Sequence, residues 1–269
     1  TNHKEGVHMT QLTRMGIDLA KQLGFIEDTR RWQARLKELE EIIRFYWSQE
    51  KGYFRAHRNT RQNLIPDEKF YSRKPDNLDS AFIGGIVQRC PQAPLILEDV
   101  RLIKTFLKLD KIFKKAYPIH QSLPKGMILW GRYQNDLYDG VHWEAGKTKG
   151  GNPWWITTLW RLQFILRFVE GTLKRGTVHI HTDSHIEFLE NLGVKIDKFK
   201  ARTGGTSIKK TEPIFREVID ALMEYIEKNF EGLLKLIPID HRLPEQMEKA
   251  TGQAQGAKSL AWSYREFIV

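Results

Sequence analysis

Apolar positions recur at three- and four-residue steps along much of the chain. In the segment 31–50 they fall at Trp32, Leu36, Leu39, Ile43 and Tyr46. This spacing places them on one stripe of an amphipathic helix, which has to bury that stripe against another element. Comparable stripes occur in the segments 12–23, 100–107, 155–169 and 215–226. The pattern therefore predicts a helical protein built from pairs of helices.

Residues that favour helix ends support these assignments. Ser184 followed by Glu187 is a capping-box pattern that predicts a helix start, and Gly193 fits the stop of the same helix. Pro213 is tolerated in the first turn of the next helix. Strand signal is confined to 177–182, where apolar and polar residues alternate. We expect about seven or eight helices.

Long polar segments separate the predicted helices, at 53–76, 111–152 and 234–259. Loops of this length are uncommon in compact domains, and they tend to carry function. These segments also hold most of the clustered aromatic and carboxylate residues. A functional site is therefore expected among them.

Composition restricts the class of protein. The 269 residues are 41% hydrophobic and 28% charged, which is ordinary for a soluble globular chain. No window approaches the roughly 18 apolar residues of a membrane span, and the first residues have no apolar core of a secretory signal. Because the chain opens on Thr1, a targeting signal can have been lost, so the compartment stays open. We expect a secreted, vesicular or lysosomal location ahead of a cytoplasmic one.

The net charge and the possible metal ligands give no further indication of function. The net charge is +10, but the basic residues are interleaved with 33 acids, which favours a solvated surface over a nucleic-acid site. Cys90 is the single cysteine, so an internal disulfide and a multi-cysteine metal site are excluded. His179 and His181 alternate on the predicted strand, whereas His185 begins a helix. We interpret all three as exposed or hydrogen-bonding side chains and expect no metal site.

The first chemical cluster joins the segments 131–140 and 150–160. It gathers apolar ring faces and fixed charges, as a neutral sugar requires for its C–H surfaces and its hydroxyls. The residues concerned are Arg132, Asp136, Tyr138, Trp143, Trp154 and Trp155. An aromatic plug in the core, with one structural Arg–Asp pair, is the alternative for this loop alone.

The second cluster spans residues 239–267. Glu245 follows a proline in a polar loop that runs into a closing helix with Trp262 and Tyr264. A carboxylate between sugar-stacking aromatics suits the second of two carboxylates in a glycosidase, which acts on water or on the anomeric carbon. A solvated loop acid is the alternative.

Four motifs follow one another in a set order: GRYQNDLYDG at 131–140, GNPWW at 151–155, LPEQ at 243–246 and LAWSY at 260–264. Together they resemble the second half of a glucoamylase of glycoside hydrolase family 15. NLDSAFIGGI at 77–86 and GTVHIHTDSHIEFLENLG at 176–193 are also similar to that family. The resemblance therefore covers nearly the whole chain.

The resemblance implies an all-α fold, the second half of an (α/α)₆ barrel, with residues 1–269 forming the C-terminal half of the catalytic domain. It implies an inverting, exo-acting hydrolase that releases β-glucose from the non-reducing ends of α-1,4-glucans such as starch, glycogen and maltooligosaccharides, without a cofactor. Glu245 matches the general base. The other matched positions are expected to bind substrate: Arg132, Asp136, Tyr138, Trp154, Gln246 and Trp262.

Such an enzyme also needs a general acid about 6.5 to 9.5 Å from the base, so that a water fits between them. KEGVH at 4–8 resembles the stretch that follows the family's acid motif, Trp-Glu-Glu, but that motif is missing here. Glu5 is the only acid nearby, and we interpret it as a surface residue; Glu144 is the next candidate. We therefore expect a second polypeptide that supplies the N-terminal half of the barrel and the acid, giving a heterodimer.

Departures from the family pattern affect subsite detail. Gln134 and Asn135 replace the usual Pro-Glu, and VHWEAGKTKG is inserted before GNPWW. Two other functions stay open: an α,α-trehalase of the same family, and a non-catalytic glucan-sensing domain. No nucleic-acid or membrane partner is expected.

Overall fold

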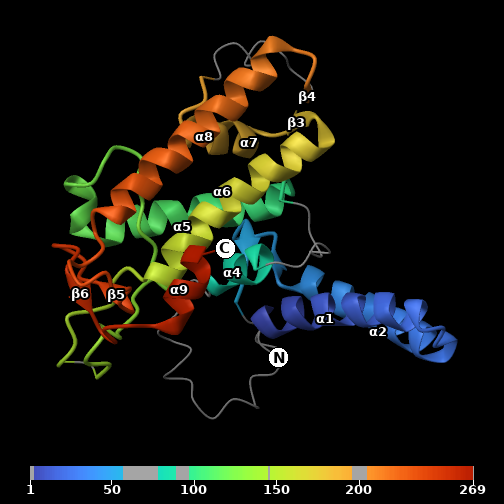
Figure 1. The fold of residues 1–269 in the computed structure, drawn as a ribbon, viewed down its shortest axis with the longest axis horizontal. Helices are drawn as coiled ribbons and strands as arrows, with labels where there is room; N and C mark the ends of the chain where they lie inside the picture. The colour runs from blue at the N-terminus through green and yellow to red at the C-terminus, as the bar shows by residue number, and fades with distance from the viewer. Residues whose placement is uncertain (1–2, 57–77, 89–96, 145, 196–204, 269) are drawn as a thin grey trace.

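A computed structural model describes residues 3–56, 78–88, 97–144, 146–195 and 205–268, and helices dominate it (Figure 1). The long helices are α1 (His3–Gln22), α2 (Ile26–Phe45), α5 (Val100–Ala116), α6 (Trp155–Arg175) and α8 (Pro213–Leu234). The shorter ones are α4 (Ala81–Val87), the 3-10 helix η1 (Pro118–Gln121), α7 (Asp183–Asn191) and α9 (Ala261–Ile268). The prediction of an all-α protein is confirmed.

The strands are short and pair locally. They form three antiparallel ladders: β1 (Trp47–Ser48) with β2 (Tyr53–Phe54), β3 (Thr177–Ile180) with β4 (Thr206–Lys209), and β5 (Gln246–Met247) with β6 (Ala254–Gln255). Val178 lies opposite Ile208, and both side chains are buried. The predicted strand signal near 177–182 is therefore confirmed as β3.

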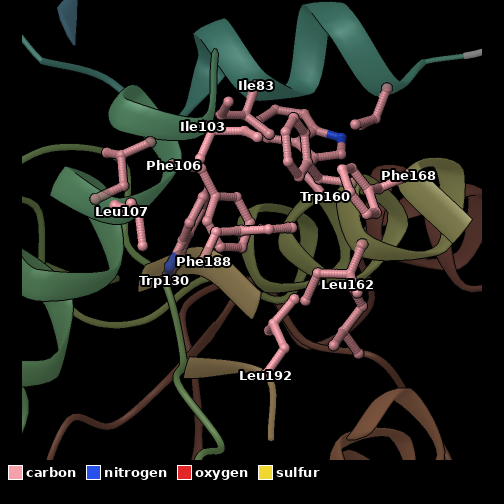
Figure 2. Close-up of a cluster of buried hydrophobic side chains, with 14 of the residues drawn as sticks. Ile83, Ile103, Phe106, Leu107, Trp130, Trp160, Leu162, Phe168, Phe188 and Leu192 are labelled. Atoms are coloured by element: carbon pink, nitrogen blue, oxygen red, sulfur yellow. The ribbon is translucent and has the colours of Figure 1, made fainter. Parts of the chain in front are cut away.

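Helix α6 is central to the packing, since it contacts α4, α8 and α9, while α5 packs against α7 (Figure 1). Aromatic rings fill the space between α5, α6 and α7 (Figure 2). Phe106 stacks on Phe164 with ring centroids 4.8 Å apart, and Phe188 meets Phe106 edge-on at 5.3 Å. These rings hold α5, α6 and α7 together, and the candidate site is built on the loop that precedes α6.

One buried ion pair crosses this core. Arg161 is 1% exposed, and its Nε donates to Asp110 Oδ1 at 2.7 Å. The same oxygen accepts the indole N–H of Trp130 at 2.7 Å. Burial alone would lower the pKa of Arg161, but the Asp110 carboxylate and the Tyr225 hydroxyl raise it above its ordinary value. Because Trp130 precedes the 131–140 loop, the pair fixes where that loop begins.

The predicted stripe on the first helix is not buried. Leu12, Met15 and Leu19 on α1 are 60%, 55% and 56% exposed. Helix α1 instead buries Ile17 and Ala20, and Gly16 lies against the ring of Trp32 on α2. The lack of a side chain at Gly16 allows this close approach.

Several helix boundaries in the structure differ from the predicted ones. Helix α2 ends at Phe45 rather than near residue 50, because the next residues pair as β1. Helix α5 extends through 111–116, which was assigned to a loop. The predicted cap at Ser184 is wrong, since α7 begins at Asp183 after Thr182. The helix stop at Gly193 and the helix start at Pro213 are confirmed. Most of the predicted loop 53–76 lies outside the described ranges.

Candidate functional site

The loop 131–140 starts from a fixed connection to the beginning of α6. The carbonyl oxygen of Trp130 accepts the N–H of Trp154 at 2.8 Å and the hydroxyl of Thr157 at 2.6 Å. The N–H of Trp130 donates to the Thr158 hydroxyl at 3.0 Å. The two segments that carry the first predicted cluster are thus held side by side.

Arg132 and Asp136 form a two-point ion pair at the head of this loop. The Nε and Nη2 of Arg132 donate to the two carboxylate oxygens of Asp136, each at 2.7 Å. The guanidinium lies 4.9 Å from the ring centroid of Trp154. Burial would lower the pKa of Arg132, but Asp136 outweighs it and the net shift is upward. The result is a permanently charged planar donor, still 35% exposed at its side chain.

Glu245 lies 107 positions further along the sequence than Tyr138 of this loop, but its carboxyl group contacts that residue. Its Oε2 accepts the hydroxyl of Tyr138 at 2.9 Å and the N–H of Ala257 at 3.3 Å. The ring of Tyr138 lies 6.0 Å from that of Trp154. Burial and the bond to Glu245 both raise the pKa of Tyr138, so the hydroxyl keeps its proton at neutral pH. The predicted base is therefore in one cluster with Arg132, Asp136, Tyr138 and Trp154.

Glu245 directly precedes β5, which pairs with β6 (Figure 1). The N–H of Glu245 donates to the carbonyl of Ala257 at 2.8 Å, and its own carbonyl accepts the N–H of Trp155 at 3.4 Å. Gly256 lies beside the carboxylate, since a Cβ added there would meet Glu245 Oε2 at 2.5 Å. Any other residue at Gly256 would displace that side chain.

The remaining predicted residues have different surroundings. Gln246 is fully buried and accepts a hydrogen bond from Asn152, and its predicted role in substrate binding stays a prediction. Trp262 is 63% exposed on α9, and its predicted role stays a prediction. Trp143 is 70% exposed, and Trp155 is buried in the core, where it reaches Glu245 through its backbone N–H.

Sequence reasoning missed Tyr133 and Asn152. The guanidinium of Arg132 lies 5.4 Å from the Tyr133 ring, and burial together with Asp136 raises the pKa of Tyr133 to about 12. Tyr133 was within a recognised motif, and its position next to Arg132 could have identified it. Asn152 was also within a motif, but only the structure reveals its hydrogen bonds.

Neither candidate acid within this chain gains support. Glu144 is exposed and paired with Lys147 at 2.6 Å. Glu5 lies on α1, but its side chain is outside the part of the structure that is described.

The histidines make hydrogen bonds, as predicted for exposed or bonded side chains: His179 bonds to Ser207 at 3.0 Å, and His185 to the Glu98 carbonyl at 3.0 Å. Across the described ranges, no three His, Cys, Asp or Glu side chains gather in a geometry that would hold a metal ion. No helix in those ranges is both long and apolar enough to span a membrane.

A helical scaffold whose loops gather a carboxylate, an arginine–aspartate pair and aromatic rings is typical of an enzyme that acts on carbohydrate. The family model for glycosyl hydrolases family 15 matches residues 7–269. The chain therefore belongs to glycosyl hydrolase family 15, as the motifs had indicated.

Solved structures and curated relatives agree with this assignment. Glucoamylases from Saccharomycopsis fibuligera and Hypocrea jecorina superpose with TM-scores of 0.84 and 0.78, each at 18% identity. The first comparison covers 99% of this chain and 54% of that chain, the second 100% and 41%. The intracellular sporulation-specific glucoamylase of Saccharomyces cerevisiae is 23% identical over 97% of this chain and 49% of its own length. The fold is that of the (α/α)₆ barrel glucoamylases, and the chain spans about half the length of these proteins.

Proposed function

We propose that this chain carries the general-base side of an inverting, exo-acting glucoamylase that releases β-glucose from the non-reducing ends of α-1,4-glucans. The observation that carries the proposal is the contact between Glu245 and Tyr138 beside the Arg132–Asp136 pair. Membership of the family and the similarity to glucoamylases support the same substrate class.

Each residue has a separate task in this proposal. Glu245 takes a proton from the water that attacks the anomeric carbon, and the Tyr138 hydroxyl orients the carboxylate. Arg132, held flat by Asp136, donates charge-assisted hydrogen bonds to sugar hydroxyls. Trp154, which is 6% exposed, packs beneath the guanidinium and is proposed to form the apolar border of the sugar site.

The general acid is proposed to come from the part of the barrel that this chain does not match. In the solved relatives the matched region is one part of a single longer chain, since it covers 54% and 41% of those chains. A separate second polypeptide is therefore not supported by the comparisons. The intact mass of the native protein tests this point directly: a single long chain would contradict a heterodimer.

The activity is tested by incubating the native protein with maltose, maltotriose and trehalose. We expect hydrolysis of the two maltooligosaccharides, and the first product seen by proton NMR to be β-glucose. Initial release of α-glucose would contradict inversion, and cleavage of trehalose alone would move the assignment to a trehalase.

A further inference from the structure

Asn152 is a buried polar residue between the two clusters. It is 4% exposed, and its side-chain NH₂ donates to the carbonyl oxygen of Asp139 at 2.8 Å and to Oε1 of Gln246 at 3.0 Å. Its Oδ1 accepts the N–H of Lys249 at 3.2 Å. Both ends of the amide are therefore used by groups on the two loops that form the candidate site.

The orientation of this amide is determined by its backbone partners. A carbonyl oxygen can only accept and an N–H can only donate, so the partners at Asp139 and Lys249 allow one placement of the oxygen and nitrogen of Asn152. Gln246 must then turn its oxygen toward Asn152. The Nε2 of Gln246 has no partner within the described ranges, and the side chain is fully buried. Asn152 thus provides the hydrogen bond that holds this side chain.

The partners of Asn152 lie next to the two residues at the centre of the proposed chemistry. Asp139 directly follows Tyr138, and Gln246 directly follows Glu245. The hydrogen bond from Tyr138 to Glu245 is 2.9 Å long. One residue further along each loop, Asn152 bridges Asp139 and Gln246, so a second connection lies beside the first. The two hydrogens of one amide set the distance between the two loops at this point.

The backbone of Asn152 is anchored as well. Its carbonyl oxygen accepts the hydroxyl of Tyr117 at 3.2 Å, and the ring of Tyr117 stacks on Phe113 of α5 at 5.8 Å. Burial raises the pKa of Tyr117, which keeps its hydroxyl protonated and able to donate. The bridge is thus tied to the helical core and does not move freely with either loop.

We propose that Asn152 is a positioning residue that holds Tyr138 and Glu245 in register for catalysis. It acts through their sequence neighbours Asp139 and Gln246, and its amide is committed to these internal hydrogen bonds. The inference rests on the proposed function of Glu245, because it assigns Asn152 a role in placing that carboxylate.

The first test is Asn152→Ala in the full-length protein, with maltotriose as substrate. We expect kcat to fall about 10- to 100-fold, as a small displacement of a reacting group does, with KM changed less than about threefold. KM is largely spared because the Arg132–Asp136 pair does not depend on this amide. Asn229→Ala is the matched control: Asn229 is also 4% exposed, and its NH₂ donates to the Tyr225 carbonyl within α8. It should lose stability and retain kcat.

A double-mutant cycle separates positioning from general destabilisation. In a Tyr138→Phe background the contact that Asn152 maintains is already lost, so Asn152→Ala should reduce kcat less than about threefold further. If the alanine variant does not fold, Asn152→Asp replaces it, since that change keeps the shape but points an oxygen at the Asp139 carbonyl. A folded Asn152 variant with normal kcat, or full additivity with Tyr138→Phe, would overturn the proposal. Failure of the proposed function looks different, because Glu245→Gln would then be as active as the unmodified protein.

Discussion

The hydroxyl of Tyr138 donates to the carboxylate of Glu245 at 2.9 Å, although 107 positions separate the two residues in sequence. The bond joins the loop 131–140, which carries Tyr138, to the loop that carries Glu245. It also places a protonated, neutral donor next to the carboxyl group that is proposed as the base.

The most direct prediction concerns Glu245. Glu245→Gln should lower kcat about 10²- to 10⁴-fold, the contribution of a positioned general base, with much less effect on KM. Glu248→Gln is the control, because Glu248 is a nearby carboxylate that accepts the N–H groups of Ala250 and Thr251 instead of facing the cluster. Steady-state kinetics on maltotriose distinguish the two variants. Equal losses would exclude a specific role for Glu245.

Tyr138→Phe keeps the ring beside Trp154 and removes only the hydroxyl. We expect kcat to fall about 10- to 100-fold, the range for one hydrogen bond to a charged group, and the melting temperature to change little. Kinetics and a thermal melt on the same preparation measure both. An unchanged kcat would show that Ala257 alone suffices to orient the carboxylate.

The Arg132–Asp136 pair should determine affinity more than rate. Arg132→Met removes the guanidinium but retains an apolar side chain over Trp154, so binding of a glucose-like inhibitor should weaken by about 1.5 to 3 kcal/mol. Asp136 is 5% exposed and would then be a buried carboxylate without its cation, so the variant should also be less stable. Isothermal titration with the inhibitor reports the first effect, and urea unfolding reports the second. An unaltered affinity would remove Arg132 from the site.

The sequence predicted which residues form the cluster better than it predicted how their side chains are arranged. Arg132, Tyr138 and Glu245 were chosen by motif, and the structure brings them together, because loops from successive helix pairs meet at one end of such a fold. The same motifs indicate Trp262, which is 63% exposed on α9, and its place in the site stays a prediction. A motif specifies a residue type in order along the chain, whereas the direction of a side chain depends on tertiary packing.

The buried face of a helix also could not be predicted from the sequence alone. The periodicity of Leu12, Met15 and Leu19 correctly predicts a helix, but the side chains that α1 buries are Ile17 and Ala20. Periodicity shows that one face of a helix is apolar, but it does not show which neighbouring element covers that face. The bridge formed by Asn152 could not be predicted either, since two of its partners are backbone groups and the third is a buried side chain, and no sequence pattern reveals their positions.

The buried ion pair should matter for stability. Arg161→Met leaves Asp110 buried, with the Trp130 indole as its remaining hydrogen-bond partner among the described residues, and we expect a loss of about 3 to 5 kcal/mol in the free energy of unfolding. Arg167→Met removes a cation from the same helix whose partner Glu170 is largely exposed, so it should change stability little. Urea titrations compare the two. Similar losses in both variants would show that burial of the pair is unimportant.

His185 should make stability fall at acidic pH. Burial lowers its pKa, and the nearby His181 and His179 lower it further, while the bond to the Glu98 carbonyl and the Glu98 charge oppose them less strongly. The folded protein therefore prefers neutral His185, whereas the unfolded chain takes up a proton near the ordinary pKa of about 6.5.

Stability from this residue is then fully present above that pH. It is lost as the pH falls toward the lower folded-state pKa, with a slope of at most about 1.4 kcal/mol per pH unit. His120, whose pKa burial also lowers, acts in the same direction. His185→Gln should flatten the dependence of the unfolding free energy on pH between 7.5 and 5, measured by urea unfolding, without abolishing it, because His120 still contributes. A slope identical to that of the unmodified protein would mean that His185 titrates equally in the folded and unfolded states.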